Sequence, residues 1–212
     1  MGGRAGKMKE NIQKPKKALE TELIGKIRGI IDYLHPGIED EMREFYIQKN
    51  QDAMKIIKRK ADFRLGFHSW FLLKFEFPSG ATAMEMADSF PMDYFNTKEK
   101  KMIKNFLGYK ESLFEILKIS EEKKDYMLKD LSDSKIYLIK TIDLPAKLKE
   151  KEIIQAIIVR NLNNEYFFYG LITSFDIFNK KEFIKEILRM IKIEEEIRKK
   201  RSKNKIEWEI LK

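Results

Sequence analysis

The chain has 212 residues, of which 43% are hydrophobic and 12% aromatic, a composition typical of a folded globular protein. It carries a formal net charge of +9, and it contains no cysteine and only two histidines. The missing cysteines exclude disulfides, thiolate nucleophiles, iron–sulfur clusters and cysteine-based zinc sites, and the sequence predicts neither a metal nor a cofactor.

The positive charge lies at the two ends of the chain. Residues 1–17 carry a net charge of +5, residues 180–212 carry another +5, and the residues between them carry −1. No apolar run has the length of a membrane span or the form of a signal peptide. We therefore expect a cytoplasmic protein with no membrane partner, and the sequence leaves the oligomeric state open.

The pattern of apolar residues predicts an α+β fold with a helical N-terminal half, a small antiparallel β-barrel or meander of about five strands, and a charged C-terminal helix. The predicted segments are a flexible basic tail at 1–15, a helical region at 16–108, an antiparallel β-module at 109–177, and a C-terminal helix with a basic segment at 178–212.

The helical region begins with an apolar stripe at helical spacing from Leu19 to Leu34, which Pro36–Gly37 ends. A second helix is expected over residues 38–61. Residues 63–77 fit either a helix or a central strand, and we favour a helix that passes into extended chain near Phe75.

Several polar residues and glycines predict where the next helices begin and end. Thr82 is expected to cap a short helix that reaches Ser89, and Asn96 with Glu99 has the spacing of a capping box. Gly108 is expected to take the left-handed conformation that often ends a helix. Gly25 and Gly29 are expected to let another helix approach the first one closely.

After Gly108 the apolar period changes from that of a helix to two, and short polar loops separate the apolar runs, which indicates sequential hairpins. The predicted strands are Leu113–Ile119, Tyr126–Leu131, Ile136–Ile142, Ile153–Arg160 and Tyr166–Phe175.

The last helix is expected to open at Asn179 and Glu182, which again have capping-box spacing, and to pack through an apolar stripe that ends at Ile197. The basic segment follows this stripe. Its cations, which are the predicted nucleic-acid-binding residues, are Arg198, Lys199, Lys200, Arg201, Lys203 and Lys205.

Four groups of residues follow one another along half of the chain: Trp70-Phe71-Leu72 before Gly80-x-Thr82, Leu113-Phe114-Glu115-Ile116, Lys129-Asp130-Leu131 before Ile136-Tyr137, and Ala156-Ile157-Ile158 before Tyr169-Gly170. In the order and spacing of these groups the chain resembles an uncharacterised family known mainly from proteins that end in a SEC-C zinc motif. The resemblance implies a helical entry followed by a β-module, and no established activity. Without cysteine, the chain lacks the SEC-C zinc motif itself.

Two histidines are the only conventional candidates for acid–base chemistry. His68 needs a partner to orient it as a general base, and Asp62, Glu76 or Asp88 is a candidate partner. A hydrogen-bonded histidine at the edge of the core is the favoured interpretation. His35 is better explained as a residue that caps the end of the first helix.

Two further groups have a functional and a structural interpretation. Asp125, Asp130 and Asp133 can hold a hard cation, but aspartates are also common in turns. In Tyr166-Phe167-Phe168-Tyr169 alternate rings point to opposite faces of a strand, so we favour packing over base stacking.

The charge distribution predicts a non-catalytic binding protein that contacts RNA or a ribonucleoprotein through its basic ends, because clustered cations neutralise phosphates and release counterions. The alternative is a protein–protein adaptor that uses the β-module or the helical half. An enzyme centred on His68 is the third hypothesis.

Overall fold

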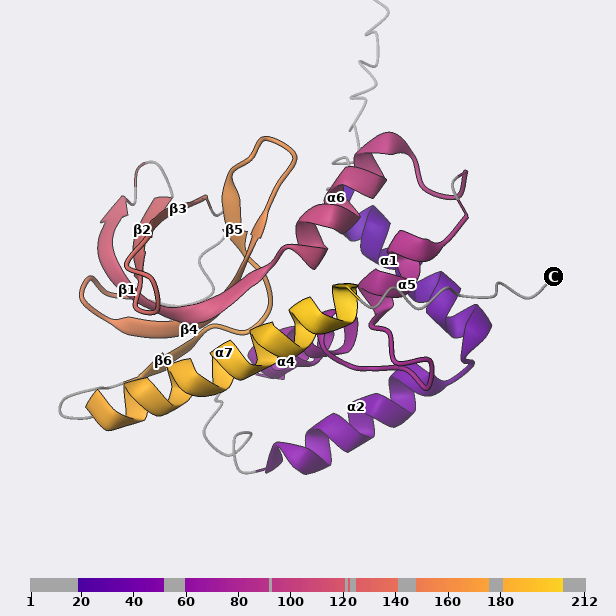
Figure 1. The fold of residues 1–212 in the computed structure, drawn as a ribbon, viewed down its shortest axis with the longest axis horizontal. Coiled ribbons are helices and arrows are strands. Elements are labelled where there is room, and N and C mark those ends of the chain that lie inside the picture. The colour runs from indigo at the N-terminus through magenta and orange to yellow at the C-terminus, as the bar shows by residue number, and fades with distance from the viewer. Residues whose placement is uncertain are drawn as a thin grey trace, which may run out of the picture.

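The computed structural model describes residues 19–51, 60–91, 93–120, 122, 125–140, 148–175 and 181–203. Its elements in chain order are α1 (Leu19–Leu34), α2 (Ile38–Lys49), α4 (Lys60–Leu73), α5 (Ala83–Ser89), α6 (Thr97–Leu107), β1 (Lys110–Ser120), β2 (Asp125–Asp130), β3 (Ile136–Lys140), β4 (Ile153–Arg160), β5 (Tyr166–Phe168), β6 (Thr173–Phe175) and α7 (Lys181–Lys203). The N-terminal helices lie beside a small β-barrel, and α7 runs past both (Figure 1). The predicted α+β class is confirmed. Among the described helices, none is long and apolar enough to cross a membrane.

The helices form where their stripes and caps predict them. α1 buries Leu23, Ile27, Ile30 and Ile31 on one face. Both predicted caps are present: Thr82 opens α5 and Asn96 opens α6, each in a capping box that satisfies free backbone N–H groups. The short α5 therefore stays ordered despite having only seven residues.

The ambiguous stretch at residues 63–77 is helical over most of its length, as α4, and leaves the helix after Leu73. Phe67, Phe71 and Leu72 are buried on the face that packs against the other helices. The prediction of a helix that passes into extended chain near Phe75 is therefore confirmed.

The predicted second helix over residues 38–61 is wrong in its extent. α2 ends at Lys49, where the backbone N–H of Asn50 bonds back to the last carbonyls of the helix. Residues 52–59 of the predicted helix lie outside the described residues, and α4 is described from Lys60. No described side chain of α2 is fully buried, so this helix gains little stability from packing, and its end is set by the backbone cap at Asn50.

Three glycine predictions are wrong. Gly108 ends α6 with φ of −85°, because its N–H continues the helical hydrogen bonds to Lys104, and no left-handed residue is needed. Gly25 and Gly29 have no neighbouring atom within 4 Å of the position that a Cβ would take, so no described helix packs closely there.

The β-module is a closed barrel. Its strands follow the order β1-β2-β3-β5-β4, and β4 returns to pair with β1, so that no edge is left between them. All pairs are antiparallel except β3 and β5, which run parallel at Ile139 and Tyr166. The expectation of a purely antiparallel module is therefore corrected, because β4 intervenes in the chain between two strands that are neighbours in space.

The fifth predicted strand, at residues 166–175, is two strands in the structure. β5 ends at Phe168 and β6 begins at Thr173, and Gly170 between them has a positive φ of 89°. This bend lets β6 pair with the first residues of β4 as an additional strand beside the barrel.

β4 separates two hydrophobic cores because its side chains alternate. Ile154, Ala156 and Ile158 point into the barrel, where they pack with Phe114 and Leu128. Ile157 and Val159 point outward and complete the core formed by the helices. The barrel and the helical half are therefore joined through one shared strand.

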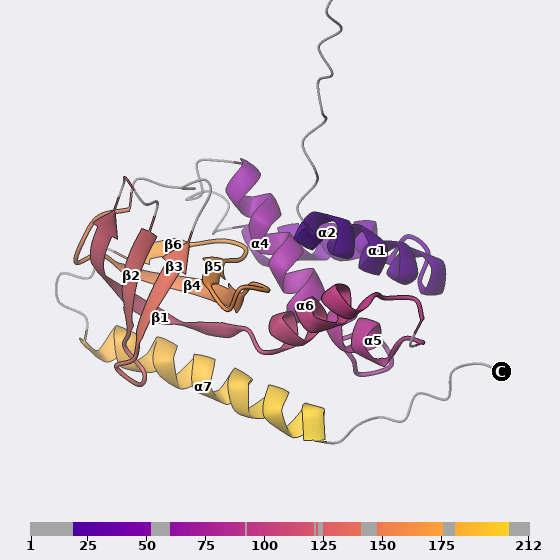
Figure 2. The ribbon, with the colours of Figure 1, turned by 90° about the horizontal axis from the view of Figure 1, so that it is seen from above.

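α7 lies along one side of the molecule next to β1 (Figure 2). Its inner stripe of Ile184, Ile187, Leu188 and Ile191 is partly buried, and no described side chain of α7 is fully buried. The predicted cap at Asn179 lies outside the described residues. The packing stripe therefore exists, but it holds the helix at the surface.

The bend at Gly170 gives a test of the fold. A Cβ at this position lies 2.3 Å from Ser69 Oγ and 2.5 Å from Ser69 Cβ, and the positive φ adds strain. Gly170→Ala is expected to destabilise the protein by about 1–3 kcal/mol in urea unfolding. Gly29→Ala is the control: in the open interior of α1 it is expected to stabilise by about 0.5–1 kcal/mol. A neutral Gly170→Ala would contradict the close contact between α4 and this bend.

Candidate functional site

The structure describes part of the predicted basic segment. Arg198, Lys199 and Lys200 lie near the end of α7. Arg201 and Lys203 belong to the same helix, although their side chains are not described, and Lys205 lies outside the described residues. The segment therefore continues a packed helix over its first part and does not start as a separate tail.

Arg198 attaches this end of α7 to the barrel. Its guanidinium carbon lies 3.9 Å from the centroid of the Tyr109 ring, immediately before β1. Burial raises the pKa of Tyr109, and the positive charge of Arg198 partly offsets that effect. A cation–π contact between two half-buried groups is worth about 1–2 kcal/mol, so Arg198 has a structural role.

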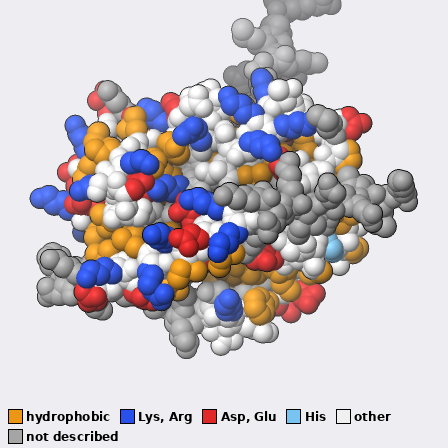
Figure 3. Space-filling model, viewed as in Figure 1, with side chains coloured by type: hydrophobic (Ala, Val, Ile, Leu, Met, Phe, Trp, Pro, Cys, Tyr) orange, Lys and Arg blue, Asp and Glu red, His pale blue; other side chains and the backbone are white. Residues whose placement is uncertain are grey.

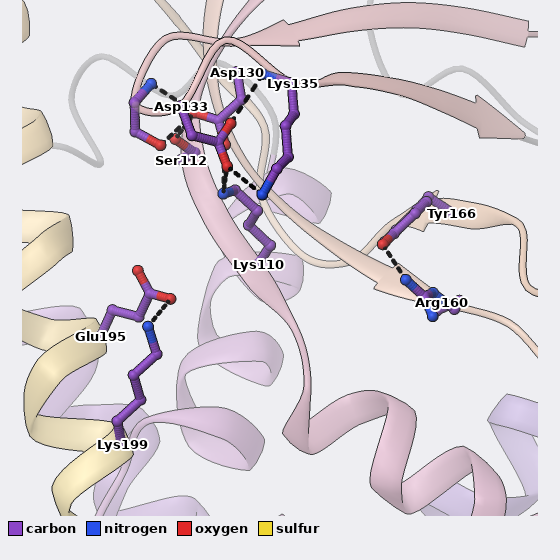
Figure 4. Close-up of polar contacts among 10 residues, drawn as sticks. Lys110, Ser112, Asp130, Asp133, Lys135, Arg160, Tyr166, Glu195 and Lys199 are labelled. Atoms are coloured by element: carbon purple, nitrogen blue, oxygen red, sulfur yellow. Dashed lines mark hydrogen bonds and ion pairs between the residues drawn. The ribbon is translucent and has the colours of Figure 1, made fainter.

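Lys199 and Lys200 are both exposed near the end of α7. Lys199 Nζ lies 2.9 Å from Glu195 Oε1 one turn earlier, and this hydrogen bond lowers the pKa of Glu195. Lys110, at the start of β1, also lowers that pKa, which shows that the end of α7 lies within electrostatic range of the barrel. Figure 4 shows the pair of Lys199 and Glu195 on α7, beside the strand β1 that carries Lys110.

Lys110 is held by a buried polar cluster at one end of the barrel. Its ammonium lies 2.7 Å from Asp130 Oδ2 and 3.1 Å from Asp133 Oδ2. Asp130 is fully buried, and its Oδ1 accepts hydrogen bonds of 2.7 Å from the Ser112 hydroxyl and from the Ser132 N–H. Burial lowers the pKa of Lys110, but the two carboxylates raise it well above its usual value, so this lysine stays charged.

The predicted cluster of three aspartates does not come together. Asp130 and Asp133 share Lys110, whereas Asp125 lies at the other end of β2 and pairs with Lys140 at 2.8 Å. In the part of the chain that the structure describes, no group of three or more acidic, histidine or cysteine side chains is arranged to hold a metal ion.

Two tyrosines lie beside Lys110 at the same end of the barrel. Lys110 Nζ is 5.8 Å from the centroid of Tyr137, whose ring meets that of Tyr166 edge to face at 5.2 Å. Arg160 lies 5.1 Å from the Tyr166 centroid, and its Nη2 donates a 2.7 Å hydrogen bond to the Tyr166 hydroxyl (Figure 4). Two neighbouring, partly exposed rings on β3 and β5 are therefore flanked by a cation from β1 on one side and a cation from β4 on the other.

The aromatic run at residues 166–169 is divided as its alternation predicts. Tyr166 and Phe168 pack on the barrel core, and Phe167 and Tyr169 pack on the helical core. The packing interpretation is confirmed for both faces, and Tyr166 is still partly exposed at the barrel end.

A groove of about 1350 Å³ lies between the helical half, the outer side of β1 and β4, and the end of α7. Lys74 stands in its wall and bridges Glu111 at 2.6 Å and Glu194 at 2.9 Å. Burial lowers the pKa of Lys74, and these carboxylates raise it further than burial lowers it. Lys74 is therefore a charged crosslink between α4, β1 and α7, and it is not a nucleophile at neutral pH.

His68 has a cationic partner in place of the predicted carboxylate. Its Nδ1 meets the guanidinium of Arg28, which is itself 3.2 Å from Glu39. Burial lowers the pKa of His68, and the charge of Arg28 lowers it further. Of the predicted partners, Asp88 pairs with Lys104 at 2.6 Å. A neutral imidazole that accepts from an arginine fits the structural interpretation of this residue.

Three residues of the barrel end were not predicted from the sequence: Lys110, Tyr137 and Arg160. They lie at the ends of different strands, and only the register of the closed barrel brings them together. The only sequence signal was a basic residue at one end of a strand, at the start of β1 for Lys110 and at the end of β4 for Arg160. Such residues are too common at strand ends to identify a site.

No protein-family model matches this chain, and no curated protein matches it either. The resemblance to the family of SEC-C-containing proteins therefore stays a prediction, and the function has to be argued from the site itself.

The environment of His68 predicts its titration. Its NMR midpoint is expected below the ordinary value of 6.5, and Arg28→Met is expected to raise it, because a positive charge is removed. Since the folded pKa is the lower one, the unfolded chain binds the proton more readily, and acidification below 6.5 is expected to destabilise the fold. Arg160→Met, on the barrel, is the control. An unchanged midpoint in Arg28→Met would contradict the contact.

Proposed function

We propose that this protein is a non-catalytic binding protein for single-stranded RNA. The surface concerned, here named the basic track, consists of Lys110, Lys135 and Arg160 at the barrel end together with Lys199 on α7, and it continues toward the rest of the basic segment. The observation that carries the proposal is the contact between Arg198 and Tyr109, which holds the basic end of α7 beside the start of β1.

The charges of the basic track suit a polyanion. Lys135 and Lys199 are exposed, and their ion pairs with Asp133 and Glu195 lie at the surface, where such pairs are weak and are readily exchanged for a phosphate. Lys110 is more firmly held by Asp130 and Asp133 and contributes mainly to the local field. Phosphate contacts of this kind give affinity that depends strongly on salt.

The rings of Tyr137 and Tyr166 supply the second element of single-strand recognition. Both are partly exposed, and their mutual edge-to-face contact holds them in fixed orientations beside the cations. Exposed aromatic rings beside a basic surface stack unpaired bases with little sequence preference. Single-stranded RNA satisfies both features, whereas a duplex offers phosphates but no free base faces.

The scaffold adds an argument by analogy only. Small five-stranded Greek-key barrels of the OB type bind oligonucleotides across strands 2 and 3 and the adjoining loops. In this chain Lys135 and Tyr137 belong to the β2–β3 turn and to β3. A shared scaffold does not establish a shared ligand, so the basic track itself remains the main support.

A protein–protein adaptor is the second candidate, and one observation favours it. The outer face of β2 and β3 exposes Met127, Ile136 and Leu138, which are 37%, 61% and 49% exposed. Met127 and Leu138 are direct cross-strand neighbours, so the three side chains form one apolar patch. This candidate requires a protein partner on the patch and no dependence on the basic track.

Binding to fluorescently labelled single-stranded RNA, measured by anisotropy against salt concentration, tests the proposal. The triple variant Lys199→Ala, Arg201→Ala, Lys203→Ala keeps the Arg198 contact and removes three cations. It is expected to bind more weakly, and the slope of log affinity against log salt is expected to fall by about 2, or roughly 0.7 per lost phosphate contact.

The control removes three exposed cations from the helical half instead: Arg64→Ala, Lys98→Ala, Lys104→Ala. Both variants have the same net charge, so only the location of the loss differs. Equal effects of the two variants would overturn the basic track. Absence of RNA binding by the unaltered chain at low salt would overturn the proposed function and leave the adaptor.

Tyr166 tests the aromatic element separately. Tyr166→Leu is expected to cost about 1–3 kcal/mol of RNA-binding free energy, because one base loses its stacking partner, and to leave the salt slope unchanged. Tyr166→Phe keeps the ring and loses only the hydrogen bond from Arg160, so its affinity is expected to stay close to that of the unaltered protein. Equal losses in both variants would show that the hydroxyl, and not stacking, is what matters.

A further inference from the structure

α7 carries a second apolar stripe that no described element covers. Met190, Ile193 and Ile197 are 53%, 42% and 44% exposed. Their spacing of three and four residues places them on one face of the helix, separate from the inner stripe of Ile184, Ile187, Leu188 and Ile191. Single exposed apolar residues are ordinary, but three in one row on the longest described helix are not.

This outer stripe is open to a partner. In Figure 2 α7 runs along the outside of the molecule, with the barrel on one side of it and no described element on the other. Figure 3 shows hydrophobic side chains among the charged ones along the path that α7 takes across this face. At its far end the stripe reaches the rim of the groove, which Ile197 helps to line.

The charged residues that flank the outer stripe indicate which partner fits. Glu186 and Arg189 lie on this face before Ile193, and Glu196 and Lys200 lie on it after Ile193. If a second α7 crosses antiparallel at Ile193, Glu186 stands opposite Lys200 of the other copy and Arg189 stands opposite its Glu196. A parallel arrangement puts like charges opposite each other. The pattern is therefore self-complementary only in the antiparallel direction.

We propose that the outer stripe of α7 is the interface of a symmetric dimer, in which the α7 helices of two copies pair antiparallel about Ile193. A two-fold axis through this residue uses the same patch on both copies, as a closed isologous interface requires. Lys199, which belongs to the basic track, is about a quarter-turn or more from the stripe. The proposed dimer therefore does not use Lys199, although it does use the neighbouring Lys200 of the basic segment.

The proposed interface is short. Three apolar side chains and two kinds of ion pair on each copy cover less surface than a standard stable interface. The dimer is therefore expected to form at high protein concentration and to dissociate on dilution. Its ion pairs set the direction of pairing more than its strength.

Sedimentation velocity over a range of concentrations, on nuclease-treated protein, tests the dimer. The unaltered chain is expected to shift from monomer to dimer as its concentration rises, and Ile193→Asp is expected to stay monomeric. Leu65→Asp is the matched control, because Leu65 on α4 is 41% exposed and does not belong to the outer stripe, and this variant is expected to dimerise normally. A chain that is monomeric at every concentration, or a dimer that Ile193→Asp leaves intact, overturns the proposal.

Charge exchange tests the direction of pairing. Glu186→Lys and Lys200→Glu each put like charges opposite each other and are expected to weaken the dimer at least several-fold. The double variant recreates opposite pairs and is expected to restore it. Circular dichroism checks that α7 stays helical, since Glu186 also bonds Arg189 within the helix. Failure of the double variant to recover, with helicity intact, contradicts the antiparallel arrangement.

Discussion

The burial of β4 on both faces is the constraint on which the rest of the structure depends. Its alternate residues fill the barrel on one side and complete the helical core on the other. The strand also pairs with β1 on one edge and with β5 and β6 on the other, so both of its edges are used. The helices and the barrel therefore keep a fixed arrangement, and the surfaces between them have a definite shape.

The groove and the basic track both follow from that arrangement. Because β1 is fixed against β4, Tyr109 and Lys110 have defined positions where the chain passes from α6 into the barrel. The guanidinium of Arg198 lies over the ring of Tyr109, and Lys74 forms ion pairs with Glu111 on β1 and Glu194 on α7. These two contacts attach α7 to both the barrel and the helical half. These contacts fix the position of α7, although none of its described side chains is fully buried.

The sequence was most informative where the signal is local. The capping boxes at Thr82 and Asn96 depend on residues three positions apart, and both are present. The bounds of β4 were also predicted correctly, because apolar residues fill most of this stretch between two polar loops. The limits of α2 and the conformation of Gly108 were predicted wrongly, because a backbone cap and continued helical hydrogen bonds decided them in place of residue preference.

The candidate site was less predictable because it is made by register. The cations of the basic segment are close together in the sequence, so the segment could be identified from the sequence alone. Lys110, Tyr137 and Arg160 come together only when β1, β3 and β4 close into a barrel, and the parallel pairing of β3 with β5 has no local sequence signal. His68 is hydrogen-bonded at the edge of the core, as predicted, but its partner is an arginine 40 residues away in the chain.

The shared strand also bears on how the chain folds. The hairpins of β1 with β2 and β2 with β3 close short loops, whereas Lys110 and Ile158 must meet across a separation of 48 residues. Such distant pairings cost loop entropy before they bring any contact, and they slow folding. Until β4 docks, neither core is complete. The barrel and the helical half are therefore expected to fold together in one cooperative step, when β4 docks and completes both hydrophobic cores.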